Sequence, residues 1–193
     1  MAAPAPVDHH ALFDDVVAVA KQSHAATAGW RAICVRAQRT VGKNVVQPLS
    51  QLELGEEIPA LRERIRGIAR RAPTDVDTLV FGLFDGLDDN GAGVFTGYHL
   101  MGATGFDPSA RWLLAAPSWM PENRFLQSPS LDAIARASVL APREVKKIVA
   151  HTLRFGAAAL LSRFATEDLP HRVVVTFDEG DFAEIRGVRQ ADI

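Results

Sequence analysis

The sequence has little that would cross-link the chain or anchor it. Its single cysteine, Cys34, excludes an internal disulfide, and its apolar neighbours in WRAICVRAQ favour a buried side chain. No run reaches the roughly 18 uninterrupted apolar residues of a membrane-spanning helix. The start, MAAPAPVDHH, has neither the basic region nor the apolar core of a secretory signal. We therefore expect a cytoplasmic protein with no membrane partner.

An excess of charge of either sign is also missing. The 21 lysines and arginines nearly balance 23 aspartates and glutamates, so the formal net charge is −2. This balance gives no molecule-wide field that would attract nucleic acid, which is a disfavoured partner. What is abundant is apolar: hydrophobic residues make up 48% of the 193 residues, enough for the core of one globular domain. We expect a single domain over residues 8–193, after a flexible N-terminus over residues 1–7.

The most unusual stretch is TLVFGLFDGLDDNGAGVFTGYHLMGATGFD, residues 78–107. Its glycines lack the Gly-x-Gly-x-x-Gly spacing of a dinucleotide loop, and its aspartates lack the ligand spacing of an EF-hand. Asn90 followed by Gly91 is instead a two-residue hairpin signal, and apolar runs flank it on both sides. We therefore predict a central antiparallel hairpin near residues 78–101, with no cofactor and no metal.

Several segments repeat apolar residues at intervals of three and four, which is the helical pattern. The clearest helix covers EEIPALRERIRGIARRAP, with acidic residues at its start and arginines at its end. Further helices are predicted over residues 8–28, 128–139 and 143–164. Gly156 and the three alanines after it predict that another element packs closely against the last of these helices.

Residues 30–48 are harder to assign. Ile33 and Val35 are β-branched, and Pro48 cannot donate to the hydrogen-bond ladder of a central strand. These features favour a strand, a turn and a short edge segment. A helix over residues 30–39 is the alternative that stays open.

The last stretch, HRVVVTFDEGDFAEIRGV, predicts two strands joined by an acidic turn. Together the elements predict an α+β fold. We expect an antiparallel sheet of about four to six strands, with the hairpin near residues 78–101 at its centre and about four helices packed on one face.

Two features are candidates for contact with another protein. Arg62, Arg66 and Arg70 recur every four residues, so they stack on one side of the Arg-rich helix and could meet an acidic surface. Trp112 and Trp119 lie beside prolines and could form a rigid amphipathic contact surface. No serine lies in a nucleophile elbow, and we predict no catalytic residues. The favoured function is therefore that of a non-enzymatic protein that binds another protein.

In size and layout the chain resembles small single-domain bacterial immunity proteins, which neutralise a toxin by covering its active site. The resemblance rests on size and fold class alone, and no motif carries it. It implies an immunity- or antitoxin-like function. The face formed by residues 156–159 could also be the seam of a homodimer.

An alternative function is that of a small-molecule-binding protein or enzyme. Its pocket would lie near Gly97 and use the polar groups of Tyr98, His99, Asp107 and Arg124. Gly82 and Gly97 lie in the interiors of the two hairpin strands, where a missing side chain lets a helix or a ligand approach the backbone closely. Of the two, helix packing is favoured.

Overall fold

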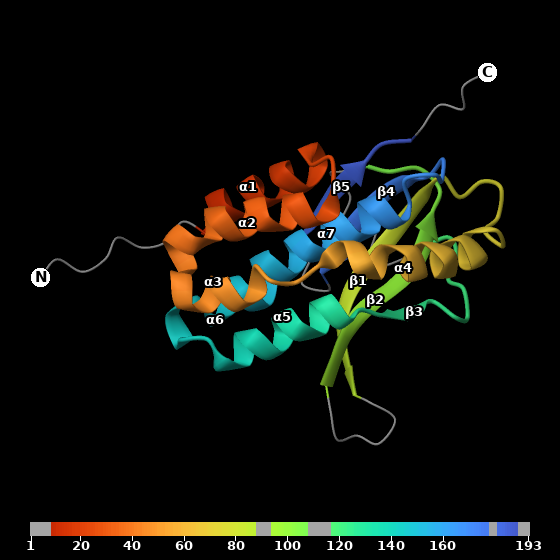
Figure 1. The fold of residues 1–193 in the computed structure, drawn as a ribbon. Helices are drawn as coiled ribbons and strands as arrows, with labels where there is room; N and C mark the ends of the chain where they lie inside the picture. Colours follow the sequence, from red (N-terminus) through yellow and green to blue (C-terminus); the bar gives the residue numbers. More distant parts are fainter. Residues whose placement is uncertain (1–8, 88–93, 108–116, 178–180, 189–193) are drawn as a thin grey trace, which may run out of the picture.

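The computed structural model describes residues 9–87, 94–107, 117–177 and 181–188 (Figure 1). The fold has two layers, a five-stranded sheet and a set of helices that covers one of its faces. The strands are β1 (Thr78–Leu87), β2 (Val94–Ala103), β3 (Phe125–Gln127), β4 (Arg172–Phe177) and β5 (Phe182–Arg186). This is the α+β class that the sequence predicts.

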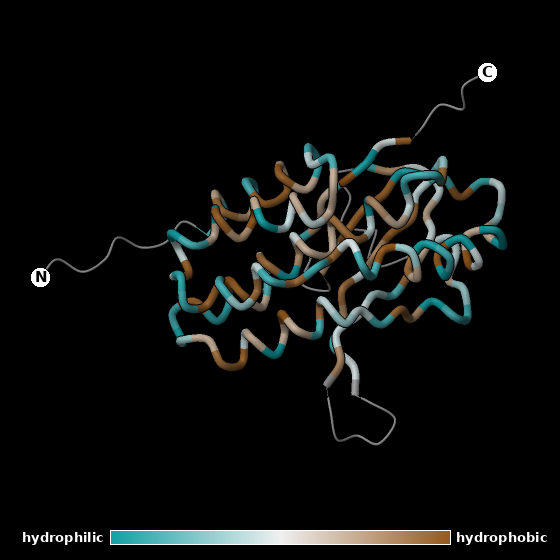
Figure 2. The backbone as a smooth tube through the Cα atoms, viewed as in Figure 1, coloured by the Kyte–Doolittle hydropathy of each residue, from teal (hydrophilic) through white to brown (hydrophobic). Residues whose placement is uncertain are grey.

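The helices precede and follow the central hairpin along the chain. They are α1 (His9–Gln22), α2 (Ala26–Val41), α3 (Lys43–Leu49), α4 (Leu54–Ala69), α5 (Pro129–Leu140), α6 (Arg143–Ile148), the π-helical turn η2 (Val149–Leu153) and α7 (Arg154–Ala165). In Figure 2 hydrophobic and hydrophilic residues alternate along most of them, as in amphipathic helices. Across the part of the chain that the structure describes, no helix has both the length and the apolar character of a membrane span.

The strand order is β3-β2-β1-β4-β5, which puts β1 at the centre of the sheet. Three of the four strand pairs are antiparallel, as expected, but β1 and β4 run parallel. A parallel pair needs a long crossover connection. Here the chain from β1 to β4 passes through β2, β3, α5, α6 and α7.

The predicted central hairpin is confirmed. β1 and β2 pair from Thr78 with Ala103 to Leu87 with Val94. Asn90 and Gly91, the predicted turn, lie outside the described residues. β1 is apolar on both sides because Phe81 faces the helices while Val80 joins a small buried cluster on the opposite face.

Gly82 and Gly97 leave room for atoms of the neighbouring strands. The expectation that a helix or a ligand approaches them is wrong. A Cβ on Gly82 would collide with the imidazole of His99, the residue opposite it on β2. A Cβ on Gly97 would collide with the carbonyl oxygen of Leu126 on β3. Both glycines therefore make room for neighbouring strands.

The preference for a strand at residues 30–48 is wrong, because the chain forms α2 and α3 there. The residues of α2 that lie in the core recur at helical spacing: Ala26, Gly29, Trp30, Ile33, Cys34, Ala37 and Val41. The indole Nε1 of Trp30 donates to the carbonyl oxygen of Leu49, at 2.8 Å, and so joins the two helices. Burial of one continuous helical face outweighs the β-propensity of single residues.

The first predicted helix is also too long. It ends at Gln22, and Gly29, the expected stop, lies inside α2. A Cβ on Gly29 would stand 2.6 Å from the Cδ2 atom of Leu160, so this glycine brings α2 close to α7.

The predictions for α4, α5 and the long helix before β4 are confirmed. The Ser128 hydroxyl caps α5 by accepting a hydrogen bond from the backbone N–H of Leu131, at 3.2 Å. The predicted helix over residues 143–164 is present as α6, η2 and α7 in succession, with the π-helical turn as an unpredicted detail.

Close packing at Gly156 is confirmed as well. A Cβ there would lie 2.5 Å from the Cγ1 atom of Val16 in α1 and 3.0 Å from the Cδ1 atom of Ile33 in α2. Residues 156–159 are buried in the monomer. Other helices of the same chain cover this face, so it offers no surface for a homodimer seam.

Cys34 lies in the core, as expected, with 2% of its surface exposed. Burial raises the pKa of its thiol to about 12, so the side chain stays protonated and packs as a small apolar group.

Alanine at two helical glycines should have opposite effects on stability. Gly156→Ala should lower the free energy of unfolding by about 1–3 kcal/mol because the added methyl group meets the branched side chains of Val16 and Ile33. Gly67→Ala, in α4, should raise it by about 0.5–1 kcal/mol because no atom lies within 4 Å of the added Cβ. Urea unfolding of both variants measures the difference. Stabilisation by both would show that α7 has room at Gly156.

Candidate functional site

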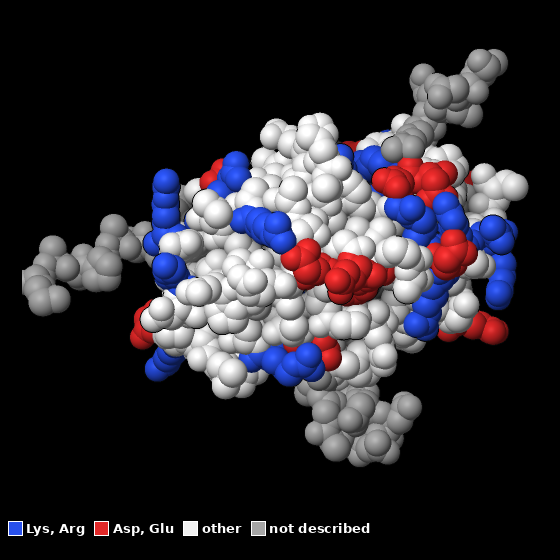
Figure 3. All heavy atoms as spheres, in the orientation of Figure 1, with Lys and Arg blue, Asp and Glu red and all other residues white. Residues whose placement is uncertain are grey.

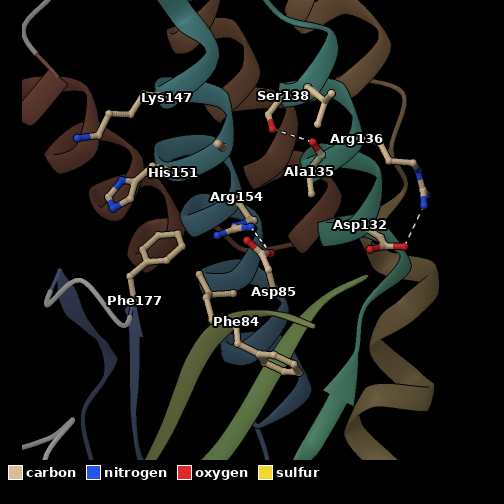
Figure 4. A pocket seen from close by; sticks show the side chains of 13 residues that line it. Phe84, Asp85, Asp132, Ala135, Arg136, Ser138, Lys147, His151, Arg154 and Phe177 are labelled. Carbon is tan, nitrogen blue, oxygen red and sulfur yellow. Dashed lines mark hydrogen bonds and ion pairs between the residues drawn. The ribbon is translucent and has the colours of Figure 1, made fainter. Parts of the chain in front are cut away.

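A pocket of about 510 Å³ opens at the carboxyl ends of the parallel strands β1 and β4 (Figure 4). Its walls come from the ends of these strands, from the inner side of α5, and from the continuous helix of α6, η2 and α7. The lining residues are Leu83, Phe84, Asp85, Asp132, Ala135, Arg136, Ser138, Val139, Lys147, Ala150, His151, Arg154 and Phe177. The carboxyl ends of parallel strands are also where open α/β sheets bind ligands.

Arg154 is the most buried charged side chain of the pocket's lining, with 11% of the side chain exposed. Its Nη1 atom donates to Oδ1 of Asp85 at 2.6 Å. The guanidinium carbon lies 5.1 Å from the centre of the Phe177 ring. The Nε atom of Arg154 is buried and has no hydrogen-bond partner within the described chain. Such an unpaired buried donor costs about 1–3 kcal/mol unless something else accepts from it.

Asp85 joins Arg154 to the sheet and to α5. It accepts a second hydrogen bond, at 2.8 Å, from the hydroxyl of Thr96 on β2. The backbone N–H of Thr96 in turn donates to Asp132 of α5 at 2.7 Å, and Asp132 pairs with Arg136 at 2.9 Å. The position of Arg154 is therefore held by contacts that reach two strands and a second helix.

The π-helical turn η2 brings His151 to the pocket wall. The imidazole stacks on the Phe177 ring, with 4.3 Å between ring centres, and its Nε2 atom lies 3.1 Å from Oδ2 of Asp181. Isolated π-helical turns are rare and occur often at functional sites. Behind His151 a smaller hollow of about 300 Å³ is lined by Phe13 and Thr152, among others.

The lining combines three cationic groups with apolar groups and the two carboxylates of Asp85 and Asp132. Arg136, Lys147 and Arg154 carry positive charge, while Leu83 and Val139 are among the apolar residues. Such a pocket can hold an anionic group at one end and an apolar group at the other.

The one hydroxyl side chain of the pocket's lining is engaged within α5. The hydroxyl of Ser138 donates to the carbonyl oxygen of Ala135 within α5, at 2.7 Å. Within the described ranges, no group of three or more histidine, cysteine, aspartate or glutamate side chains is placed to hold a metal ion.

Two of the three arginines in the stripe predicted from the sequence form ion pairs with other residues of the chain. Arg62 pairs with Glu167 at 2.5 Å, and Arg66 pairs with Asp168 at 2.6 Å, just beyond the end of α7. Arg70 is exposed after the end of α4. These ion pairs attach α4 to the segment after α7, so two of the three arginines already have acidic partners.

Of the two predicted tryptophans, Trp112 lies outside the described residues. Trp119 is partly buried against the core and forms an isolated bridge with Gly102, with backbone N–O distances of 2.9 and 3.1 Å. Near it in the chain, Met120 and Phe125 are exposed over 57% and 47% of their surfaces.

The four residues of the predicted ligand pocket are not brought together. Tyr98 is fully buried beneath the helices, where its hydroxyl donates to the carbonyl oxygen of Ala158 at 3.4 Å. Burial, with the nearby charge of Glu57, raises the pKa of Tyr98 well above its usual value. His99, next in the strand, lies on the opposite face of the sheet.

The other two members of that set lie apart from Tyr98. Arg124 places its guanidinium carbon 4.6 Å from the centre of the Phe125 ring. Asp107 is exposed, after the end of β2.

The sequence did contain a signal for the pocket. Lys147, His151 and Arg154 are spaced by four and three residues, so they form a polar stripe on a helix that is otherwise rich in buried residues. A polar stripe of this kind on a largely buried helix needs partners or a cavity. Asp85 has no comparable signal, because its meeting with Arg154 depends on the fold.

Comparison with protein-family models, with curated proteins and with solved structures finds no match for this chain.

The ion pair between Arg66 and Asp168 should make the stability of the folded protein depend on pH. Burial acts to raise the pKa of Asp168, but hydrogen bonds and the charges of Arg66 and Arg62 outweigh it, so this pKa is lowered. A lowered folded-state pKa gives stability that is present above the unfolded value, near pH 4, and is lost as the pH falls through the folded value. Asp168→Asn should therefore lower the Tm at pH 7, and the difference from the native chain should shrink toward pH 3.

Thermal unfolding followed by circular dichroism measures this difference. Asp14→Asn, on the exposed side of α1, controls for the loss of one carboxylate. A Tm difference for Asp168→Asn that stays constant from pH 7 to the acid limit would contradict the assignment.

Proposed function

We propose that this protein binds a small amphipathic anion in the pocket at the ends of β1 and β4. The observation that carries the proposal is Arg154, whose guanidinium is held almost out of solvent and whose buried Nε atom has no hydrogen-bond partner among the residues that the structure describes. A guanidinium presents several N–H donors in a fixed plane, which suits the two or more oxygens of a carboxylate, sulfonate or phosphate.

The surroundings of Arg154 support an anion as the bound group. Asp85 takes one donor of the guanidinium and thereby fixes its orientation. Lys147 also lines the pocket and is exposed, so its positive charge can attract an approaching anion. Asp85 and Asp132 oppose this charge, but both already accept hydrogen bonds from Thr96.

The remainder of the pocket supports an apolar body on the ligand. Leu83, Ala135 and Ala150 line it, and Val139 on its wall is 67% exposed. Covering such a side chain with an apolar ligand is favourable, at about 25 cal/mol for each Å² of apolar surface removed from water. The volume of about 510 Å³ is in the range of small-molecule sites.

Binding of another protein, as an immunity-like partner, is the second candidate. Met120 and Phe125 favour it, because both are exposed apolar side chains in the segment around Trp119. The arginine stripe no longer favours it, since Arg62 and Arg66 have partners within the chain. A pull-down with Met120→Ser and Phe125→Ser variants distinguishes this function from anion binding.

Octanoate is a suitable probe for the proposed pocket because it joins a carboxylate to a short apolar chain. In isothermal titration it should bind more tightly than acetate, which lacks the chain, and than octan-1-ol, which lacks the charge. Arg154→Met should weaken octanoate binding by about tenfold or more, since a hydrogen bond to a charged group contributes roughly 1.5–3 kcal/mol.

Because Arg154→Met leaves the half-exposed carboxylate of Asp85 without its ion-pair partner, the double variant Arg154→Met, Asp85→Asn is the second variant, in which both charges are removed together. Arg70→Gln, on the exposed end of α4, is the matched control and should bind as the native chain does. Equal affinity for octanoate and octan-1-ol, or unchanged binding by the double variant, would reject the anion site.

A further inference from the structure

A second groove lies on the other side of α5, between the first half of α4 and the start of α5. It has a volume of about 500 Å³ and shares no lining residue with the anion pocket. Nothing in the proposed function uses it. Its lining differs in character, because it joins apolar side chains to a row of glutamates.

The apolar part of the groove is continuous across two elements. Leu52 precedes α4, Ala60 and Leu61 lie on α4, and Pro129 opens α5. Ala60 and Pro129 are exposed, and Leu52 is partly so. An apolar strip of this kind is suited to covering by side chains from outside the chain.

The acidic part lies along the same groove at the start of α4. Figure 3 shows a patch of acidic side chains on the face of the molecule that carries α4, and Glu53, Glu56 and Glu57 line the groove. Glu56 is exposed and forms no ion pair in the described part of the chain. Glu53 pairs with Arg31 at 2.6 Å, although both side chains stay largely in solvent.

Glu57 adds a carboxylate of which only one oxygen has a hydrogen-bond partner among the described residues. Its Oε2 atom accepts the backbone N–H of Ser130 at 3.1 Å, while its Oε1 atom is buried and has no partner among the residues described. Glu57 is also one of the groups that raise the pKa of the buried Tyr98. The negative potential of Glu57 therefore reaches both into the core and into the groove.

The helix dipole explains only part of this arrangement. Acidic residues in the first turn of α4 stabilise the helix, which accounts for Glu56 and Glu57. It does not account for the exposed apolar strip beside them. The one basic residue of the groove, Arg64, donates to the carbonyl oxygen of Phe125 at 3.0 Å and so is directed toward the edge of β3.

We infer that this groove docks a cationic amphipathic segment of another protein. Apolar side chains of the segment cover Leu52, Ala60 and Pro129, and its lysines or arginines lie over Glu53 and Glu56. The charge of the groove selects a basic partner, which is the opposite of the acidic partner that the arginine stripe suggests. The mode is that of an amphipathic helix laid into an apolar groove.

The test uses a fluorescein-labelled peptide of about 18 residues with leucine and lysine at helical spacing, and a scrambled peptide of the same composition. Fluorescence anisotropy at physiological salt should show tighter binding of the periodic peptide. The variant Glu53→Gln, Glu56→Gln should weaken that binding about fivefold, since two rim charges contribute roughly 0.5 kcal/mol each. Asp14→Asn, Asp15→Asn, which removes two exposed acids of α1, should leave it unchanged.

Ala60→Arg gives a second test, because it puts a positive charge and a bulky side chain on an exposed position of α4 and spares the core. It should abolish binding of the periodic peptide while octanoate binding stays the same. Equal affinity for the two peptides, equal weakening by the α1 variant, or binding that survives Ala60→Arg would overturn the inference. Octanoate binding reports on the other pocket, so the two proposals can fail separately.

Discussion

The burial of α7 is the constraint on which the rest of the structure depends. Most of its residues are buried, and it packs against helices on both sides as well as against β4. This is feasible because Gly156 and the alanines after it present almost no side-chain volume, so Val16 and Ile33 approach the helix directly. Larger side chains on that small surface would push α1 and α2 away from α7, which also packs against the sheet.

The candidate site follows from the same constraint. A helix that is buried along its length must place any polar group at an end or against a cavity. The α6–η2–α7 helix does both: its π-helical turn lies where β1 and β4 stop, and there His151 and Arg154 emerge beside Phe177. The pair of Arg154 and Asp85 is weak evidence for stability, since desolvation of the Arg154 guanidinium offsets much of its attraction to the half-exposed Asp85.

The local elements were largely predictable from the sequence, and the failures have physical causes. The hairpin, α4 and α5 carry their own signals in turn residues, spacing and the Ser128 cap. In α2, the β-branched Ile33 favoured a strand in the prediction. The segment is helical because a whole helical face of it is buried. Gly82 could not be interpreted before its partner across the sheet, His99, was known.

The site was harder to predict because charge pairs form between residues that are far apart in the chain. Arg62 and Glu167 are separated by 105 positions, and Arg154 and Asp85 by 69. A stripe of arginines therefore looks the same in the sequence whether distant acids neutralise it or not. The polar stripe of Lys147, His151 and Arg154 was the better signal, because it interrupts a helix whose neighbours are buried.

The two proposed sites select ligands of opposite charge, although the net charge of the chain is only −2. The helix between them, α5, is held from both sides at its first turn. Glu57 accepts the N–H of Ser130 on the groove side, and Asp132 accepts the N–H of Thr96 on the pocket side. A partner that draws Glu57 toward itself would act on the same turn that supports Thr96. Coupling between the sites would require two arrangements of this turn, so α5 is the element at which to look for it.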